Sequence, residues 1–173
     1  LIATMAAWLM ALALHLKPVD FLPLNLSMLQ YIVFRLLTSF CGVFGFSIMF
    51  NSPVPLAMSA AVIGAISNTL RLELVDLASL PPAAAAFFAA MIAGLLASAY
   101  KKHSGFPRIA ITVPSIVIMV PGLYLYRAIY NLGMMNLSIS ASWFASATLI
   151  ILALPLGLIF ARIMTDKMFR YCT

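Results

Sequence analysis

Charged side chains are scarce in this sequence. Asp, Glu, Lys and Arg make up only 8% of its 173 residues, whereas hydrophobic residues make up 65% and the mean hydropathy is +1.12. An ordinary soluble domain is about a quarter charged. So few polar side chains would leave a soluble fold uncovered, and the composition therefore predicts an integral membrane protein with little mass outside the bilayer.

Residues that mark enzymes and cofactor sites are also lacking. The two cysteines, Cys41 and Cys172, make neither a disulfide framework nor a metal-binding cluster. The sequence has no paired-histidine metal motif, no glycine-rich phosphate loop and no serine elbow. We therefore predict no catalytic residues, no metal, no cofactor and no enzymatic activity.

The net charge of +6 would elsewhere suggest nucleic acid, but here the basic residues lie at the ends of apolar segments. Lys and Arg in such places orient membrane helices and meet anionic lipid. Most of them fall in the loop from Lys101 to Arg108 and in the tail from Arg162 to Arg170. We expect both to be cytoplasmic, with Arg71 near the opposite surface, and predict the lipid bilayer rather than nucleic acid as partner.

Apolar segments alternate with turn-forming stretches, and we predict an all-α fold, a polytopic bundle of transmembrane helices. The first segment is shorter than the roughly 20 residues of a span and lacks an initial Met, so we expect it to continue a helix that begins upstream. Residues 1–30 are then a partial span and linker, and residues 31–173 a transmembrane domain. The predicted spans are residues 1–16, 31–50, 56–75, 83–100, 109–130 and 141–163.

The segment from Ile109 to Tyr130 organises the chain, because it is long enough to cross a bilayer yet contains Pro114 and the pair Pro121-Gly122. Each proline removes a helical hydrogen bond, and bare backbone persists in hydrocarbon only where protein or a wet cavity covers it. The prolines are close to two turns apart, so we expect both breaks on one face. A half-helix beginning at Gly122 would point its amides at the membrane interior, where a substrate carboxylate could bind.

Small residues recur at four-residue intervals on two other segments, a pattern that permits close helix contact. We expect these helices to pack tightly together. Because so short a chain encloses little by itself, we also predict a homo-oligomer or a complex with a further subunit. The small-residue stripes are Ala60, Gly64 and Asn68 on one segment and Ala90, Gly94 and Ser98 on another.

The stretches GFSIMFNSP (residues 45–53) and VPSIVIMVPGLYLY (residues 113–126), with a helix that runs from Gly64 into Arg71, resemble the small integral-membrane half of the threonine/serine exporter family. The proline-glycine stretch is the most specific part of this similarity, which extends from Tyr31 to the C-terminus. The first 30 residues have no counterpart in the short stand-alone subunit. They leave open whether this is part of a fused protein or a longer subunit.

This resemblance implies a multi-pass protein of the inner cell membrane that exports threonine, serine or small carboxylates such as succinate, driven by the proton gradient. Family members occur as fused two-domain chains or as separate subunits, so it also implies an N-terminal half as partner. Two alternatives stay open from the residues alone. One is a passive channel subunit, and the other is a scaffold that anchors a catalytic partner without transport.

The broken segment supplies most of the candidate substrate-binding residues. Tyr124 lies one turn past Pro121, and Arg127 could pair with a carboxylate. Both could instead be interfacial, the tyrosine in an aromatic belt and the arginine by snorkelling, and the prolines could equally be packing kinks. The candidates in this segment are Pro114, Ser115, Pro121, Gly122, Tyr124 and Arg127.

The end of the 56–75 segment supplies the remaining candidates. Asn68 and Arg71 could bind substrate, although Asn68 could merely join helices by an interhelical hydrogen bond. Glu73 and Asp76 lie three residues apart on one helix face and are candidates for proton coupling. A solvated cluster paired with Arg71 is the alternative.

Overall fold

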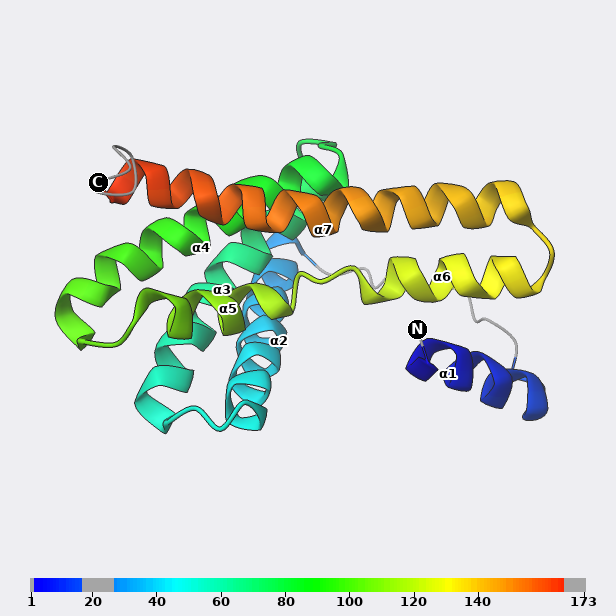
Figure 1. Cartoon of the computed structure of the whole chain (residues 1–173), viewed down its shortest axis with the longest axis horizontal. Helices are drawn as coiled ribbons and strands as arrows, with labels where there is room; N and C mark the ends of the chain where they lie inside the picture. The colour runs from blue at the N-terminus through cyan, green and yellow to red at the C-terminus, as the bar shows by residue number, and fades with distance from the viewer. Residues whose placement is uncertain (1, 17–26, 167–173) are drawn as a thin grey trace. The chain divides into compact units, whose positions relative to one another are not determined.

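A computed structural model describes residues 2–16 and 27–166 of the chain. Within these residues the secondary structure is helical with no strand, which confirms the predicted all-α class. The helices are α1 (Ile2–Ala13), α2 (Met28–Met49), α3 (Val54–Asp76), α4 (Pro82–Ser104), α5 (Arg108–Val117), α6 (Gly122–Gly133) and α7 (Leu137–Thr165) (Figure 1).

The helices divide into two compact units. The smaller unit consists of residues 1–26 and 121–149, and the larger of residues 27–120 and 150–173. Most of the predicted linker of residues 17–30 lies outside the described residues. The two units are described separately below.

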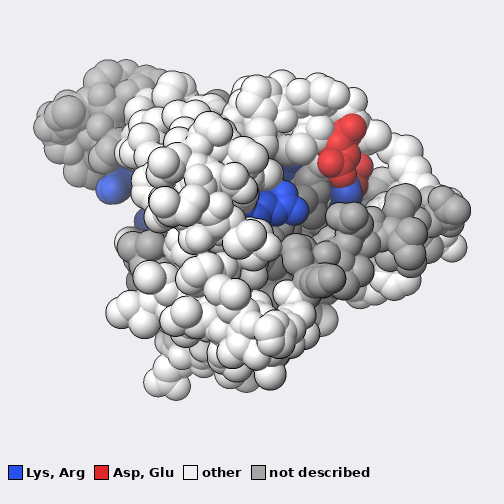
Figure 2. All heavy atoms as spheres, turned by 90° about the vertical axis from the view of Figure 1, so that its right-hand side faces the viewer, with Lys and Arg blue, Asp and Glu red and all other residues white. Residues whose placement is uncertain are grey.

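Long apolar helices dominate the described part of the chain. Four of them, α2, α3, α4 and α7, are long and apolar enough to cross a membrane, and α5 with α6 would make a fifth crossing if the two act as one broken span. Large apolar side chains are exposed along these helices, and the face in Figure 2 carries few charged atoms. Such a surface is stable against lipid rather than water, as expected of a multi-pass membrane protein.

The helix α2 begins three residues earlier than predicted, because Ser27 caps it. The Ser27 hydroxyl oxygen accepts a hydrogen bond from the Gln30 amide at 3.4 Å, and the Gln30 side-chain oxygen accepts one from the Ser27 amide at 3.0 Å. This reciprocal capping box satisfies two amides that would otherwise lack partners. The helix therefore starts at Met28.

Small residues let α3 form the centre of the larger unit, where it packs against α2, α4 and α5. A Cβ added to Gly64 would lie 2.7 Å from a methyl group of Val43 on α2 and 2.9 Å from the carbonyl oxygen of Ser115 on α5. Ala60, one turn away, is fully buried. The predicted stripe on this helix is thus a packing surface for two neighbours.

The stripe on α4 meets a matching stripe on α7. A Cβ on Gly94 would lie 2.6 Å from the Cβ of Ala161, and one on Gly157 would collide with the carbonyl oxygen of Phe87. The stripes pair Ala90 with Gly157, Gly94 with Ala161, and Ser98 with Thr165. Because residue numbers rise together along the two stripes, α4 and the end of α7 run parallel.

The smaller unit contains α1, α6 and the first part of α7. Gly133 at the end of α6 leaves room for the indole of Trp8 on α1. The Ser140 hydroxyl donates to the carbonyl oxygen of Ala128 at 2.6 Å and so joins α7 to α6. The first helix, predicted as part of a membrane span, has 12 residues and packs against α6.

The expectation of two breaks in the 109–130 segment was wrong, because α5 runs through Pro114. The proline is buried, and the next residue, Ser115, is hydrogen-bonded to α3. A proline inside a helix costs one hydrogen bond, and packing on α3 holds α5 together at this point. The chain leaves helical geometry only after Val117, so the two prolines do not share a helix face.

Candidate functional site

The break itself lies between α5 and α6, where the two units meet in sequence. The amides of Met119 and Val120 donate to carbonyl oxygens three residues back, at 2.9 and 3.1 Å, which tightens the last turn. Pro121 then precedes α6 and makes no side-chain hydrogen bond to its amides. Gly122 is exposed, with no atom within 4 Å of an added Cβ. An open, uncapped helix start carries the positive end of the helix dipole.

Tyr124 and Arg127 share a partner that sequence reasoning missed, Trp143 on α7. The Tyr124 and Trp143 rings meet edge to face with centroids 5.4 Å apart. The guanidinium carbon of Arg127 lies 4.8 Å from the Trp143 ring centroid. A guanidinium held on an indole face keeps its planar array of N–H donors for a carboxylate. In the sequence alone, Trp143 is distinguished only as one of two tryptophans.

Pro114 and Ser115 lie in the larger unit and are both buried. The Ser115 hydroxyl is within hydrogen-bonding distance of two carbonyl oxygens, at 2.7 Å to Ile111 and 3.0 Å to Ala60. Its single hydrogen is shared between an acceptor in its own helix and one on α3. These contacts give Ser115 a structural task that its sequence position alone did not indicate.

Asn68 and Arg71 come together with a serine of α2. The Asn68 side-chain amide donates to the Ser39 hydroxyl at 2.8 Å, and the Arg71 Nε donates to the Asn68 side-chain oxygen at 3.1 Å. Ser39 and Asn68 are buried. The interhelical hydrogen bond that the sequence offered as an alternative role for Asn68 is present.

Glu73 and Asp76 are both paired with Arg35 of α2. Arg35 Nη1 lies 2.7 Å from a carboxylate oxygen of Glu73, and Nη2 contacts a carboxylate oxygen of Asp76. The sequence-based alternative named Arg71 as the paired cation and did not foresee that Arg35 would pair with both carboxylates. The signal that could have revealed it is a single arginine inside the apolar 31–50 segment, since such a charge needs a partner.

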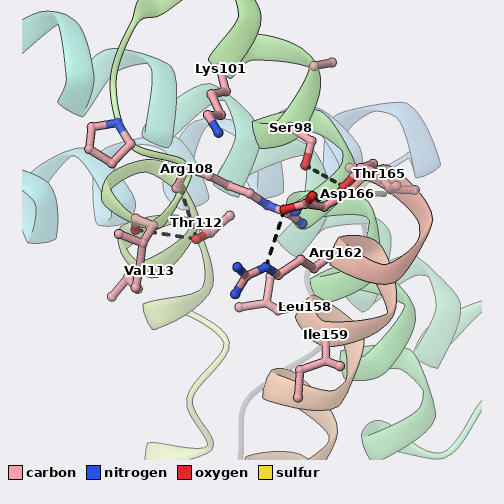
Figure 3. Close-up of a pocket in the computed structure, with 14 residues that line it drawn as sticks. Ser98, Lys101, Arg108, Thr112, Val113, Leu158, Ile159, Arg162, Thr165 and Asp166 are labelled. Atoms are coloured by element: carbon pink, nitrogen blue, oxygen red, sulfur yellow. Dashed lines mark hydrogen bonds and ion pairs between the residues drawn. The ribbon is translucent and has the colours of Figure 1, made fainter. Parts of the chain in front are cut away.

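A pocket of about 950 Å³ opens between α4, α5 and the end of α7 in the larger unit (Figure 3). Its polar lining includes Lys101, Arg108, Arg162 and Asp166. The sequence marked three of these residues only as basic ends of helices. Among the described residues, no group of three or more His, Cys, Asp or Glu could hold a metal ion.

Comparisons with known proteins bear on the larger part of the chain. Residues 35–164 match a family described as "Threonine/Serine exporter, ThrE". An uncharacterized protein from Haemophilus influenzae is 30% identical over 133 residues, which cover 68% of this chain and 44% of that protein. The chain therefore spans less than half the length of this relative. No solved structure matches it significantly.

Proposed function

The chain belongs to the threonine/serine exporter family, and we propose that it is the membrane half of a secondary exporter for threonine, serine or small carboxylates such as succinate. The observation that carries this proposal is the family match over residues 35–164, which includes both α3 and the broken α5-α6 segment. The family is one of transporters rather than enzymes. We place the protein in the inner cell membrane and propose the proton gradient as its driving force.

We propose that the substrate carboxylate binds at the start of α6. The exposed amide end at Gly122 and the guanidinium of Arg127, five residues further along the same helix, are both suited to an anion. The contact of Trp143 with Arg127 and Tyr124 supports this assignment, since it restricts two long side chains before substrate arrives. Broken helices are typical of transporter binding sites.

For the larger unit we propose a coupling role. A proton on Glu73 would remove the charge that pairs with Arg35, which would weaken the link between α3 and α2. Asn68 and Arg71 lie five and two residues before Glu73 on α3 and are retained as candidate substrate contacts. Pro114 and Ser115 are retained as residues that support the broken segment from the α3 side.

The deciding experiment compares Gly122→Leu with Gly122→Ala in proteoliposomes. No atom lies within 4 Å of an added Cβ, so we expect both proteins to fold with wild-type thermal stability. The leucine side chain would cover the helix start and should reduce threonine efflux at least tenfold, while alanine should leave most of it. Serine and succinate as competitors would rank the substrates, and efflux with and without a proton gradient would test the driving force.

Wild-type efflux in the Gly122→Leu protein would show that the substrate does not bind at the start of α6. Efflux that follows the substrate gradient alone, whatever the proton gradient, would favour the passive channel. Absence of flux for all three substrates in the wild-type protein with its partner subunit present would favour the scaffold.

A further inference from the structure

The pocket between α4, α5 and α7 is lined by both basic and aliphatic side chains. The export of amino acids does not require this combination. Lys101 lies near the end of α4, Arg108 opens α5, and Arg162 lies in the last turn of α7. Figure 3 shows these basic side chains directed toward one shared space together with Asp166. Among the described residues that line the pocket, one carboxylate against three cations leaves two positive charges in excess.

The guanidinium of Arg108 is fixed across the pocket. Its Nη1 donates to the Thr165 hydroxyl oxygen at 3.1 Å, which uses one of five N–H donors. Gly94 makes room for this reach, because an added Cβ would lie 3.1 Å from Arg108 Nη2. Arg108 therefore presents a held, planar donor array at the junction of three helix ends.

The single carboxylate neutralises little of this charge. Arg162 Nε lies 3.9 Å from an Asp166 carboxylate oxygen, and both side chains are about half exposed. Exposed ion pairs contribute little to stability and are screened by salt. The cations are thus suited to a second, stronger acceptor such as a phosphate.

Next to the cations, the pocket is lined by aliphatic side chains that are exposed on the surface of the protein. Ile109 is 69% exposed, and Val113 and Ile159 are each 43% exposed; Leu158 lies beside Ile159 in the same lining. In a membrane-spanning bundle, exposed aliphatic side chains next to a helix end face lipid chains at the level where headgroups begin. A small soluble anion would leave this wall uncovered.

We propose that the pocket binds an anionic phospholipid, with its phosphate on Arg108, Arg162 and Lys101 and one acyl chain along Val113 and Ile159. Basic pockets between transmembrane helices on the cytoplasmic side suit anionic headgroups. The excess positive charge disfavours a zwitterionic headgroup and a net-neutral amino acid alike. This inference rests on the membrane location and the pocket, and stands apart from the proposed substrate.

The test is thermal unfolding of the full chain in neutral detergent, titrated with three probes. Phosphatidylglycerol carries the phosphate and the chains, phosphatidylcholine of the same chains adds a compensating cation, and glycerol 3-phosphate lacks the chains. We expect saturable stabilisation by phosphatidylglycerol, with much weaker effects of the other two. Arg162→Gln should weaken the apparent affinity for phosphatidylglycerol about fivefold, the equivalent of about 1 kcal/mol for one basic residue near the surface.

Arg127→Gln is the matched control, because it removes the same charge from the smaller unit and should leave phosphatidylglycerol affinity unchanged. Val113→Asn should weaken the binding of phosphatidylglycerol without changing the response to glycerol 3-phosphate. If Arg162→Gln does not fold, Lys101→Gln serves as the second variant, since Lys101 is exposed at the end of its helix. Equal stabilisation by both lipids, full stabilisation by glycerol 3-phosphate, or equal losses in Arg162→Gln and Arg127→Gln would each overturn the proposal.

Discussion

Arg35 is a cation inside an apolar helix, and its two carboxylate partners explain how the bilayer tolerates it. Glu73 and Asp76 lie one turn apart on α3, where both reach the same guanidinium. They differ in environment, because the side chain of Glu73 is 18% exposed and that of Asp76 is 52% exposed. A charge pair that excludes water is more costly to disrupt than one that water screens. Glu73 is therefore the partner on which this link depends most.

This difference predicts unequal effects of neutralising the two acids. Glu73→Gln should abolish the stimulation of efflux by a proton gradient while threonine exchange continues, and should lower the free energy of unfolding by about 1 kcal/mol. Asp76→Asn is the matched control and should change either quantity much less. Proteoliposome efflux with and without an imposed gradient measures the first effect. If a proton gradient still stimulates efflux fully in the Glu73→Gln protein, Glu73 does not couple protons to transport.

At the scale of the helix, a glycine packed against another helix differs from a glycine with open space around it. Gly157 lies against the backbone of α4, where an added Cβ would meet the carbonyl oxygen of Phe87. Gly45 on α2 has no atom within 4 Å of an added Cβ. Backbone atoms yield far less than flexible side chains, so the first site has no room for even a methyl group.

We therefore expect Gly157→Ala to destabilise the protein by about 1 to 3 kcal/mol. Gly45→Ala, the same substitution in open space, should be neutral or stabilise by about 0.5 to 1 kcal/mol, because alanine favours helix over glycine. Thermal unfolding in detergent distinguishes the two outcomes. Equal melting temperatures for both variants would show that α4 and α7 do not pack as closely as described.

The helices and their contact faces followed from the sequence because both depend on local pattern. Four-residue spacing of small residues identified the α4 stripe, but it could not name the partner, since an equivalent stripe on α7 lies 67 residues away. The effect of Pro114 was mispredicted for a related reason. Whether a proline breaks a helix depends on what packs around it, here Ala60 across from Ser115.

The candidate site was predictable only in part. Tyr124 and Arg127 became candidates because they follow a proline-glycine break, and their shared contact with Trp143 could not be read from that pattern. Trp143, Arg35 and the basic pocket were missed because each is defined by neighbours distant in sequence. Side chains such as these acquire a role only when helices from separate segments meet.

At the scale of the whole molecule, the chain corresponds to only part of a related protein. It spans 44% of a relative from Haemophilus influenzae, and four of its described helices are long and apolar enough to cross a membrane. We propose that a further subunit or domain, the N-terminal half of the same exporter family, or a second copy of this chain completes the transport path.

This proposal predicts that the isolated chain is not an active monomer. Purified alone, it should form oligomers in detergent or show little threonine efflux in liposomes, and efflux should rise when the partner subunit is reconstituted with it. Size-exclusion chromatography with light scattering gives the oligomeric state, and the same liposome assay gives the activity. A monodisperse monomer that transports threonine by itself would contradict the prediction.

The parallel stripes of α4 and α7 repeat every four residues, so their spacing alone would permit more than one register along the helix pair. Sliding one helix along the other by four residues, about 6 Å, would put the Cβ of Ala153 or Ala161 where Gly157 now lies against the carbonyl oxygen of Phe87. The position of Gly157 and the contact between Ser98 and Thr165 therefore fix the register. Because Arg108 on α5 contacts the same Thr165 hydroxyl, an anion that drew Arg108 away would loosen α5 from the end of α7 and leave the α4–α7 register unchanged.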